Sequence, residues 1–470
     1  MNEISSSKWW VLASVACGTF MATLDSSIVN IALPTLTKDL ATNLYKAKWV
    51  VIIYLLVITC LLLPFGKLSD QLGRKRVFQS GYVIFTIGSF FCAMSPKLDW
   101  LILARAVQAI GVSMLMANGP AIITAYFPSK ERGAALGTLA MVVSAGLLSG
   151  PAVGGFLISK FTWPSIFWVN IPIGIVALAI SQHYLPKDPP RRVISSFDWV
   201  GTFLQCIILL ALIAAFDPLI VSISGSGPIQ ISRWTMLAVA ILFGAVFIKV
   251  ESEASSPLFD FSLLKIRTFW TANLASFLTF VSFSSVFVLM PFFLEEALHL
   301  ATHKAGLFMT AIPVAIFIVA PISGRLSDRM GTRGLSFIGA FIGSVGLLAM
   351  AGVFGLGIHE NISHAGIVLA LGSIGLATGL FQSPNNSAIM GAVPLEKLGV
   401  ASALLATVRN LGMVIGTGLA TSLFTWKMDN TGGNFVESIH FAHFVAGILG
   451  IGAMIASLYR QPRKPRKQPK

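Results

Sequence analysis

The chain has 470 residues, of which 55% are hydrophobic and 11% are charged, and its formal net charge is +14. A water-soluble protein is excluded, because so apolar a chain could not cover its surface with polar side chains. The charge does not indicate nucleic-acid binding, since the lysines and arginines gather in short loops and in the tail after Arg460.

Long apolar runs dominate the chain, and about fourteen of them reach the ~20 residues that cross a bilayer as helix. The runs are continuous and do not alternate with polar residues, which excludes a strand-built barrel. The sequence therefore predicts an all-α polytopic membrane protein. The expected spans are residues 9–33, 48–68, 77–95, 99–126, 133–159, 163–185, 198–221, 233–250, 269–294, 305–325, 335–355, 362–390, 399–425 and 437–459.

Two polar segments interrupt these runs and divide the chain. PKDPPRRVISS occupies residues 186–196 and ESEASSPLFD occupies residues 251–260. They predict four parts, listed in order: a six-helix bundle at 1–185, a linker with two inserted helices and a loop at 186–260, a second six-helix bundle at 261–459, and a basic tail at 460–470. Lysine and arginine are concentrated on alternate loops, which predicts that both termini are cytoplasmic. The tail either sets this topology or also lies against anionic lipid headgroups.

A motif that occurs twice indicates a duplication. GKLSDQLGRKR at residues 66–76 follows the second span, and GRLSDRMGTRG at 324–334 follows the second of the last six spans. Gly111, Pro120, Glu131 and Gly133 recur as Gly375, Pro384, Glu396 and Gly399 at a nearly constant offset. Two equivalent bundles that meet around a midplane cavity are how rocking transporters are built.

Asp25 is the deepest acid, about sixteen residues into the first span. A carboxylate at this depth costs several kcal/mol unless it faces a wet cavity, pairs with a base or binds a proton. Arg105, on the fourth span, reaches a similar depth by an independent count. We expect the two to face one cavity within direct or water-bridged reach, where a conformational change would load or release a proton. The alternatives are a structural acid for Asp25 and a static helix tie for Arg105.

Several motifs resemble one family. GKLSDQLGRKR resembles the cytoplasmic loop motif of the major facilitator superfamily. LDSSIVNIALPTL (24–36), SPNNSAIMGAVP (383–394) and GVASALLATVRNLG (399–412) resemble the fourteen-span drug:proton antiporters of the DHA2 type. The resemblance covers nearly the whole chain. It implies two pseudo-symmetric six-helix bundles with two inserted helices, fourteen in all, in a bacterial-type cytoplasmic (inner) membrane. It also implicates Asp25 and Arg105, with Gln108 and Gly111, in proton coupling.

The fifth span carries a glycine-rich run, GLLSGPAVGG. A spacing of four places its glycines on one helix face, while the proline bends the helix. Packing alone explains such a run, but it also resembles the antiporter motif that marks exporters of the superfamily, which favours efflux. The residues concerned are Gly146, Gly150, Pro151, Gly154 and Gly155.

The repeated loop motif also predicts a latch at the cytoplasmic surface. Asp70 is expected to bind the N-terminus of the thirteenth span near Gly399, since a helix N-terminus attracts an anion. By symmetry, Asp328 is expected near Gly133, and Arg74 is expected to pair with Glu131. The alternative is that the bases of the motif only enforce topology.

Polar residues in otherwise apolar spans are candidates for the lining of a substrate cavity. Arg409 lies near the midplane of the thirteenth span. One acid in a roomy apolar pocket suits lipophilic, including cationic, compounds, whereas Arg409 would favour a lipophilic anion. The other candidates are Asn30, Asn118, Gln382 and Asn385.

These observations predict a proton-coupled secondary active exporter of lipophilic small molecules that works by alternating access. The alternative is a dedicated exporter or flippase of one endogenous metabolite or lipid. An ATP-driven pump is excluded because no G-x-x-x-x-G-K-[ST] loop is present, and no nucleophile or acid cluster at membrane depth indicates an enzyme. No cofactor or metal is expected, because the four cysteines lie in apolar runs without ligand spacing. The expected partners are substrate, protons and lipids. We expect a monomer, and an accessory efflux partner remains open.

Overall fold

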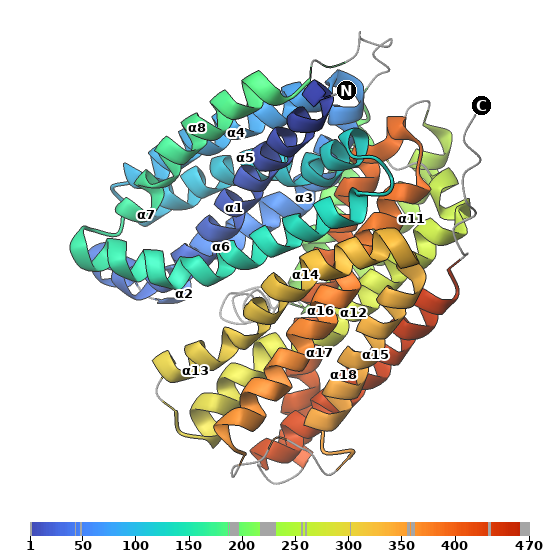
Figure 1. Cartoon of the computed structure of the whole chain (residues 1–470). Coiled ribbons are helices and arrows are strands. Elements are labelled where there is room, and N and C mark those ends of the chain that lie inside the picture. The colour runs from blue at the N-terminus through green and yellow to red at the C-terminus, as the bar shows by residue number, and fades with distance from the viewer. Residues whose placement is uncertain are drawn as a thin grey trace. The chain divides into compact units, whose positions relative to one another are not determined.

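The computed structural model describes residues 2–42, 44–47, 49–186, 188, 197–216, 232–254, 257–258, 261–300, 302–354, 358, 362–430 and 434–460. Every regular element in these residues is a helix (Figure 1). Most of the predicted linker and the tail beyond Arg460 lie outside the described residues. These helices confirm the prediction of an all-helical membrane protein. Continuous apolar runs form helices because a helix satisfies its own backbone hydrogen bonds.

The first six predicted spans correspond to long helices joined by short segments. They are listed in chain order with two short helices: α1 (Asn2–Asp39), α2 (Leu44–Ala47), α3 (Trp49–Leu72), α4 (Arg74–Ala93), α5 (Leu98–Tyr126), α6 (Arg132–Lys160), α7 (Ser165–Trp168) and α8 (Asn170–Tyr184). Two helices follow at the predicted insertion, α9 (Trp199–Phe216) and α11 (Arg233–Glu253).

The last six spans begin after a short 3-10 helix, η1 (Phe261–Lys265). The remaining elements are α12 (Arg267–Phe292), the π-helical turn η2 (Phe293–Ala297), α13 (Thr302–Met309), α14 (Ala311–Met330), α15 (Thr332–Met350), α16 (His364–Ala392), η3 (Leu395–Lys397), α17 (Leu398–Asn430) and α18 (Phe435–Leu458).

Twelve helical segments in the described residues are long and apolar enough to cross a membrane. The other two predicted spans correspond to α4, which is not among the twelve, and to α9, whose apolar part, Trp199–Ala215, is shorter than the others. The predicted seventh span also extends into residues 217–221, which lie outside the described residues. The structure therefore supports twelve spans by length and composition and leaves the count of fourteen as a prediction.

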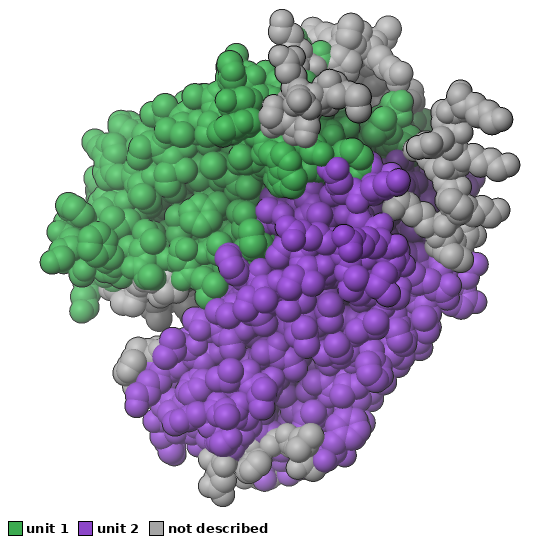
Figure 2. Space-filling view, in the orientation of Figure 1, with its two compact units in different colours: residues 1–128, 141–260, 394–411 green, residues 129–140, 261–393, 412–470 purple. Residues whose placement is uncertain are grey.

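The chain forms two compact units (Figure 2). Unit 1 contains residues 1–128, 141–260 and 394–411, and unit 2 contains residues 129–140, 261–393 and 412–470. Two helices are divided between the units. The first turns of α6 belong to unit 2, and the first turns of α17 belong to unit 1.

Two glycines of the repeated motif each lie between two consecutive helices. Gly73 separates α3 from α4 with φ of 106°, and Gly331 separates α14 from α15 with φ of 88°. A side chain would be strained at such a φ, so both copies require glycine at this position. The duplicated sequence thus produces a duplicated backbone break.

An apolar cluster in unit 1 lies where α1, α3, α5 and α7 approach one another. Ile28, Val50 and Phe167 are fully buried in it. The same helices carry the polar residues predicted as a proton site, and the cluster fixes their relative positions. Hydrocarbon packing thereby holds a polar site away from water.

Candidate functional site

Asp25 on α1 and Arg105 on α5 form a buried ion pair. Nη1 of Arg105 donates to Oδ2 of Asp25 at 2.5 Å, and both side chains are 0% exposed. The predicted contact between these two residues is present. Removing one partner of such a pair costs about 3–5 kcal/mol, because the other charge is left uncompensated in the interior.

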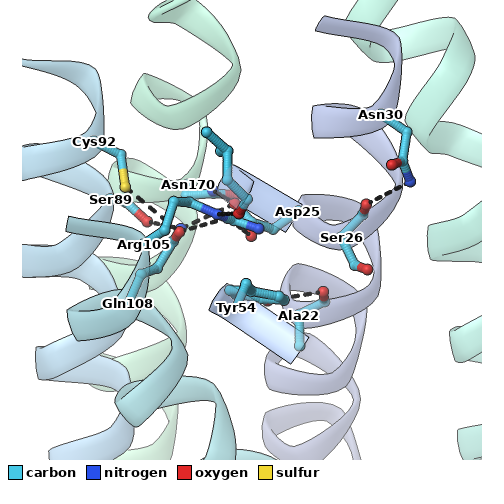
Figure 3. Close-up of polar contacts among 11 residues, drawn as sticks. Ala22, Asp25, Ser26, Asn30, Tyr54, Ser89, Cys92, Arg105, Gln108 and Asn170 are labelled. Carbon is cyan, nitrogen blue, oxygen red and sulfur yellow. Dashed lines mark hydrogen bonds and ion pairs between the residues drawn. The ribbon is translucent and has the colours of Figure 1, made fainter. Parts of the chain in front are cut away.

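Two amides complete the shell around the carboxylate. Nε2 of Gln108 and Nδ2 of Asn170 both donate to Oδ1 of Asp25 at 2.9 Å. Gln108 lies one turn after Arg105 on α5, so both face α1, whereas Asn170 is the first residue of α8. Three donors from two helices therefore converge on one carboxylate (Figure 3).

The arginine is held by its own set of contacts. Nε donates to the carbonyl of Val50 at 3.2 Å, and Nη1 also donates to Oε1 of Gln108 at 2.6 Å. The guanidinium carbon lies 3.8 Å from the centroid of the Tyr54 ring, and the Tyr54 hydroxyl donates to the carbonyl of Ala22. The π face offsets part of the cost of burying the cation. Nη2 has no hydrogen-bond partner among the described residues.

One expectation about this pair is wrong for the structure at hand. Asp25 and Arg105 were expected to face a wet cavity, but neither has any exposed surface. The reason is that three protein donors surround the carboxylate, the Tyr54 ring covers one face of the guanidinium, and the helices that carry them pack closely. In Figure 3, Asn30 lies on the side of α1 that faces away from the ion pair.

The two predicted carboxylate contacts of the loop motif are present. Oδ1 and Oδ2 of Asp70 accept from the amides of Gly399 and Val400 at 2.9 and 3.1 Å. Asp328 accepts from the amides of Gly133 and Ala134, both at 2.8 Å. Each carboxylate thus binds a helix N-terminus, where the macrodipole favours an anion. Whether the contact depends on transport state stays a prediction.

Pairs of glycines let the helices approach closely enough for Asp70 and Asp328 to reach the helix N-termini. A Cβ built on Gly66 or on Gly399 would collide with the backbone of the other residue. Gly133 and Gly324 form the corresponding pair in unit 2. The motif glycines at positions 66 and 324 therefore serve the carboxylates that follow them, a role that the repeat by itself did not reveal.

Arg74 has partners other than the predicted one. Its Nη2 donates to Oδ1 of Asp70 at 2.9 Å and also to the carbonyl of Leu395. The predicted pairing of Arg74 with Glu131 stays a prediction. Arg74 therefore supports the same carboxylate that caps α17.

The glycine-rich run on α6 packs against α1. A Cβ on Gly146, Gly150 or Gly154 would collide with Thr23, Ser27 or Ile28, respectively. Gly155 has open space around it, and the side chain of Pro151 lies outside the described residues. The spacing of four thus gives one contact face, as expected for close helix packing.

The predicted cavity amides divide into two groups. Asn118 and Asn385 are both 0% exposed, which contradicts their prediction as cavity-lining groups. Their side chains bond to helix carbonyls, of Met114 and Ala272 respectively, because a buried amide needs such partners. Asn30 is exposed and Gln382 is partly exposed, so both remain candidates.

Arg409 differs from Arg105 in lacking a counter-charge. It is half-buried on α17, and no hydrogen bond or ion pair joins it to any part of the chain that the structure describes. The adjacent Asn410 donates to Thr59 on α3 at 3.3 Å. An unpaired cation inside a membrane span is costly, which marks Arg409 as a functional candidate.

Sequence reasoning missed Tyr54 and Asn170. A signal for Asn170 was available, because it is a polar residue in the apolar run FWVNIPIG. Tyr54 gave no such signal, since an aromatic residue in an apolar span usually packs against its neighbours.

The described residues contain no group of three or more metal ligands. Chemically, the site offers one carboxylate that accepts from a guanidinium group and two amides.

Comparisons with known proteins agree with this architecture. A model of the Major Facilitator Superfamily matches residues 15–417 and, separately, residues 272–470. The riboflavin transporter RibZ of Clostridioides difficile is 38% identical over 421 residues, covering 90% of this chain and 89% of its own. The methyl viologen resistance protein SmvA of Salmonella typhimurium is 30% identical over 421 residues, covering 89% and 82%.

A solved structure shares the fold. The human organic anion transporter MFSD10 superposes with a TM-score of 0.70, covering 96% of this chain and 99% of its own, at 14% identity. At that identity the likeness supports the fold alone.

Proposed function

The chain belongs to the major facilitator superfamily of transporters, and we propose that it exports lipophilic small molecules in exchange for protons by alternating access. The observation that carries this proposal is the ionisable pair Asp25–Arg105, buried inside a membrane-spanning bundle. A charged group at this depth is retained for function, because apolar packing would be at least as stable. The relative SmvA, named for methyl viologen resistance, supports efflux.

In the proposed cycle Asp25 binds and releases the transported proton. Protonation removes the charge that holds Arg105 Nη1, so the ion pair weakens when the proton arrives and strengthens when it leaves. All four members of the site, Asp25, Arg105, Gln108 and Asn170, belong to unit 1. A movement of unit 1 as a rigid body would therefore leave the site unchanged. Proton access must come from a local shift of α1, α5 or α8.

The remaining predicted residues take supporting roles in this proposal. Arg409, Asn30 and Gln382 contact substrate, and the carboxylates of Asp70 and Asp328 release their helix N-termini when the cytoplasmic side opens. The α6 glycine face permits α1 and α6 to slide, as the antiporter resemblance implies. We also propose the DHA2-type layout. In it α4 and α9 cross as well, giving fourteen spans with α9 and α11 inserted, and both termini lie in the cytoplasm of a monomeric inner-membrane protein.

Transport in inverted membrane vesicles tests the proposal. An imposed pH gradient should drive uphill accumulation of dyes from a panel that includes methyl viologen, and Asp25→Asn should abolish that accumulation while binding persists. The matched control is Asn430→Ala, which changes an exposed amide at the end of α17 that has no part in the proposal. Uphill transport by Asp25→Asn with unchanged pH dependence would show that Asp25 is not the coupling residue.

A second candidate function is riboflavin transport. The relative named for it is more similar to this chain, at 38% identity, than the resistance protein at 30%. Growth of a riboflavin auxotroph on low riboflavin, with uptake of labelled riboflavin, separates the two candidates. Rescue that is lost in Asp25→Asn, with no dye transport, would favour the dedicated transporter.

A further inference from the structure

The Asn170 side chain uses only one end of its amide. Its Nδ2 donates to Oδ1 of Asp25 at 2.9 Å, whereas its own Oδ1 has no hydrogen-bond partner within the described residues. Asn170 is 1% exposed, so bulk water does not reach that oxygen. A buried acceptor without a donor is costly and calls for an explanation.

Gln108, the other amide beside Asp25, is occupied at both ends. Its Nε2 donates to Asp25 and to Oγ of Ser89, at 2.9 and 2.7 Å. Its Oε1 accepts from Nη1 of Arg105 at 2.6 Å and from Sγ of Cys92 at 3.7 Å. Turning this amide over would place an N–H donor against the guanidinium, which offers only donors. The orientation of Gln108 is therefore fixed.

The Asn170 amide has no such restraint. An amide oxygen and an NH2 group are nearly equal in size, and the last side-chain torsion of asparagine is broad and close to two-fold. A half-turn about that bond therefore needs little repacking. It breaks only the hydrogen bond to Asp25, because the other end of the amide has no partner among the described residues.

The charge of Asp25 decides which orientation is favourable. An ionised carboxylate only accepts hydrogen bonds and therefore faces Nδ2 of Asn170, as in the structure (Figure 3). A carboxyl group protonated on Oδ1 is a donor there, and it needs the acceptor that Asn170 presents after a half-turn. The titratable groups that face Asp25 from other helices are Arg105 on α5, Tyr54 on α3 and Cys92 on α4.

We propose that the Asn170 amide turns over when Asp25 binds a proton, and that it stabilises the carboxylate and the carboxylic acid in turn. This role rests on the proposed function of Asp25 as the proton carrier. It explains how a carboxylate with no exposed surface can bind a proton, because the amide supplies the hydrogen bonds that water would otherwise exchange. Asn170 thus takes part in the proton reaction.

Infrared difference spectra between alkaline and acidic pH test this role on the full-length protein in nanodiscs. Lowering the pH should produce the carboxylic acid C=O band of Asp25. At the same pH it should move the side-chain amide C=O band of Asn170 to lower wavenumber, because its oxygen gains a donor. Asp25→Asn should remove both changes, and Asn170→Leu should remove the amide change. In vesicles, Asn170→Leu should slow pH-driven transport about tenfold, because the protonated site loses its acceptor.

The matched control is Asn118→Leu. Asn118 is buried in the same unit, and its Oδ1 also lacks a hydrogen-bond partner among the described residues. Its Nδ2 donates to the backbone carbonyl of Met114 at 2.7 Å and not to a titratable group. Asn118→Leu should therefore keep both spectral changes and transport like the parent. If Asn170→Leu is poorly stable, Asn170→Ser removes the same amide with a smaller side chain and gives the same spectral test.

The outcomes separate this role from proton coupling itself. An Asn170 band that stays fixed over the whole titration, or equal losses of transport in Asn170→Leu and Asn118→Leu, would overturn the proposal. Both band changes without pH-driven transport would refute proton coupling and keep the role of Asn170. Proton-driven transport with a fixed Asn170 band would refute the role of Asn170 alone.

Discussion

Gly88 on α4 packs against Gln108 on α5, and Gly346 on α15 packs against Ser373 and Ile374 on α16. Each glycine follows its motif glycine, Gly73 or Gly331, by the same number of residues. In the second six-helix segment, Ser373 and Ile374 therefore make the contact that Gln108 makes in the first.

Leu371 lies one turn before Ile374, as Arg105 lies one turn before Gln108. Both Leu371 and Ile374 are 0% exposed and belong to the apolar core of unit 2. Corresponding regions of α5 and α16 thus hold an ionic network in the first copy and an apolar core in the second. Since the apolar version packs without a desolvation cost, the network is not required by the framework, and we infer that it was kept for the transport reaction.

The largest expected effect comes from breaking the network on one side. Arg105→Met leaves Asp25 buried without a counter-charge and should lower the free energy of unfolding by about 3–5 kcal/mol and abolish transport. Adding Asp25→Leu makes the first segment resemble the second and should restore at least half of that stability, with transport still absent. Thermal unfolding and vesicle transport measure both. A double variant less stable than Arg105→Met would contradict the comparison.

The matched control for this experiment lies in the second segment. Leu371→Met conserves volume in the apolar core and should cost less than about 1.5 kcal/mol. It should also leave proton-driven transport intact, whereas equal loss of transport at this position would show that the two segments share the coupling role.

The two carboxylates that bind helix N-termini should have the next largest effects. Asp70→Asn and Asp328→Asn each replace an acceptor oxygen by a donor and remove a charge, which should cost about 2 kcal/mol in thermal unfolding. Hydrogen exchange at the amides of Gly399 and Val400, which bond to Asp70, should change with substrate or pH in the parent. Exchange that ignores both would argue for a fixed structural contact.

Glycine faces offer a smaller test of the duplication. Gly150→Ala drives a methyl group into Ser27 on α1, and Gly416→Ala drives one into Val281 on α12. Each should lower the free energy of unfolding by about 1–3 kcal/mol. Gly155→Ala, with open space around it, should be neutral or slightly stabilising. A cost at position 155 equal to that at 150 would refute the assignment of the contact face.

The smallest expected effect is at Arg74. Its ion pair with Asp70 spans one helical turn, and the Arg74 side chain is 20% exposed. Solvent screens such a pair, so Arg74→Gln should change the free energy of unfolding by about 0.5 kcal/mol. A change as large as that of Asp70→Asn would mean that Arg74, and not the helix N-terminus, holds the carboxylate.

The sequence by itself determined the helical class, the repeated loop motif and the common level of the two buried charges. Continuous apolar runs of bilayer length predict helices, and a constant rise per residue places Asp25 and Arg105 at one level. The attraction of a helix N-terminus for an anion, with the symmetry of the repeat, predicted that Asp70 and Asp328 reach Gly399 and Gly133. The structure contains both contacts.

Tertiary structure alone decided which way these side chains point. Asp25 was expected level with Arg105 and pairs with it, yet its enclosure with Asn170 and Tyr54 depends on how α3 and α8 pack around α1. Asn118 and Asn385 turn into their units for the same reason. Rise along an axis is a property of one helix, whereas the face that meets a neighbour is set by every helix that packs beside it.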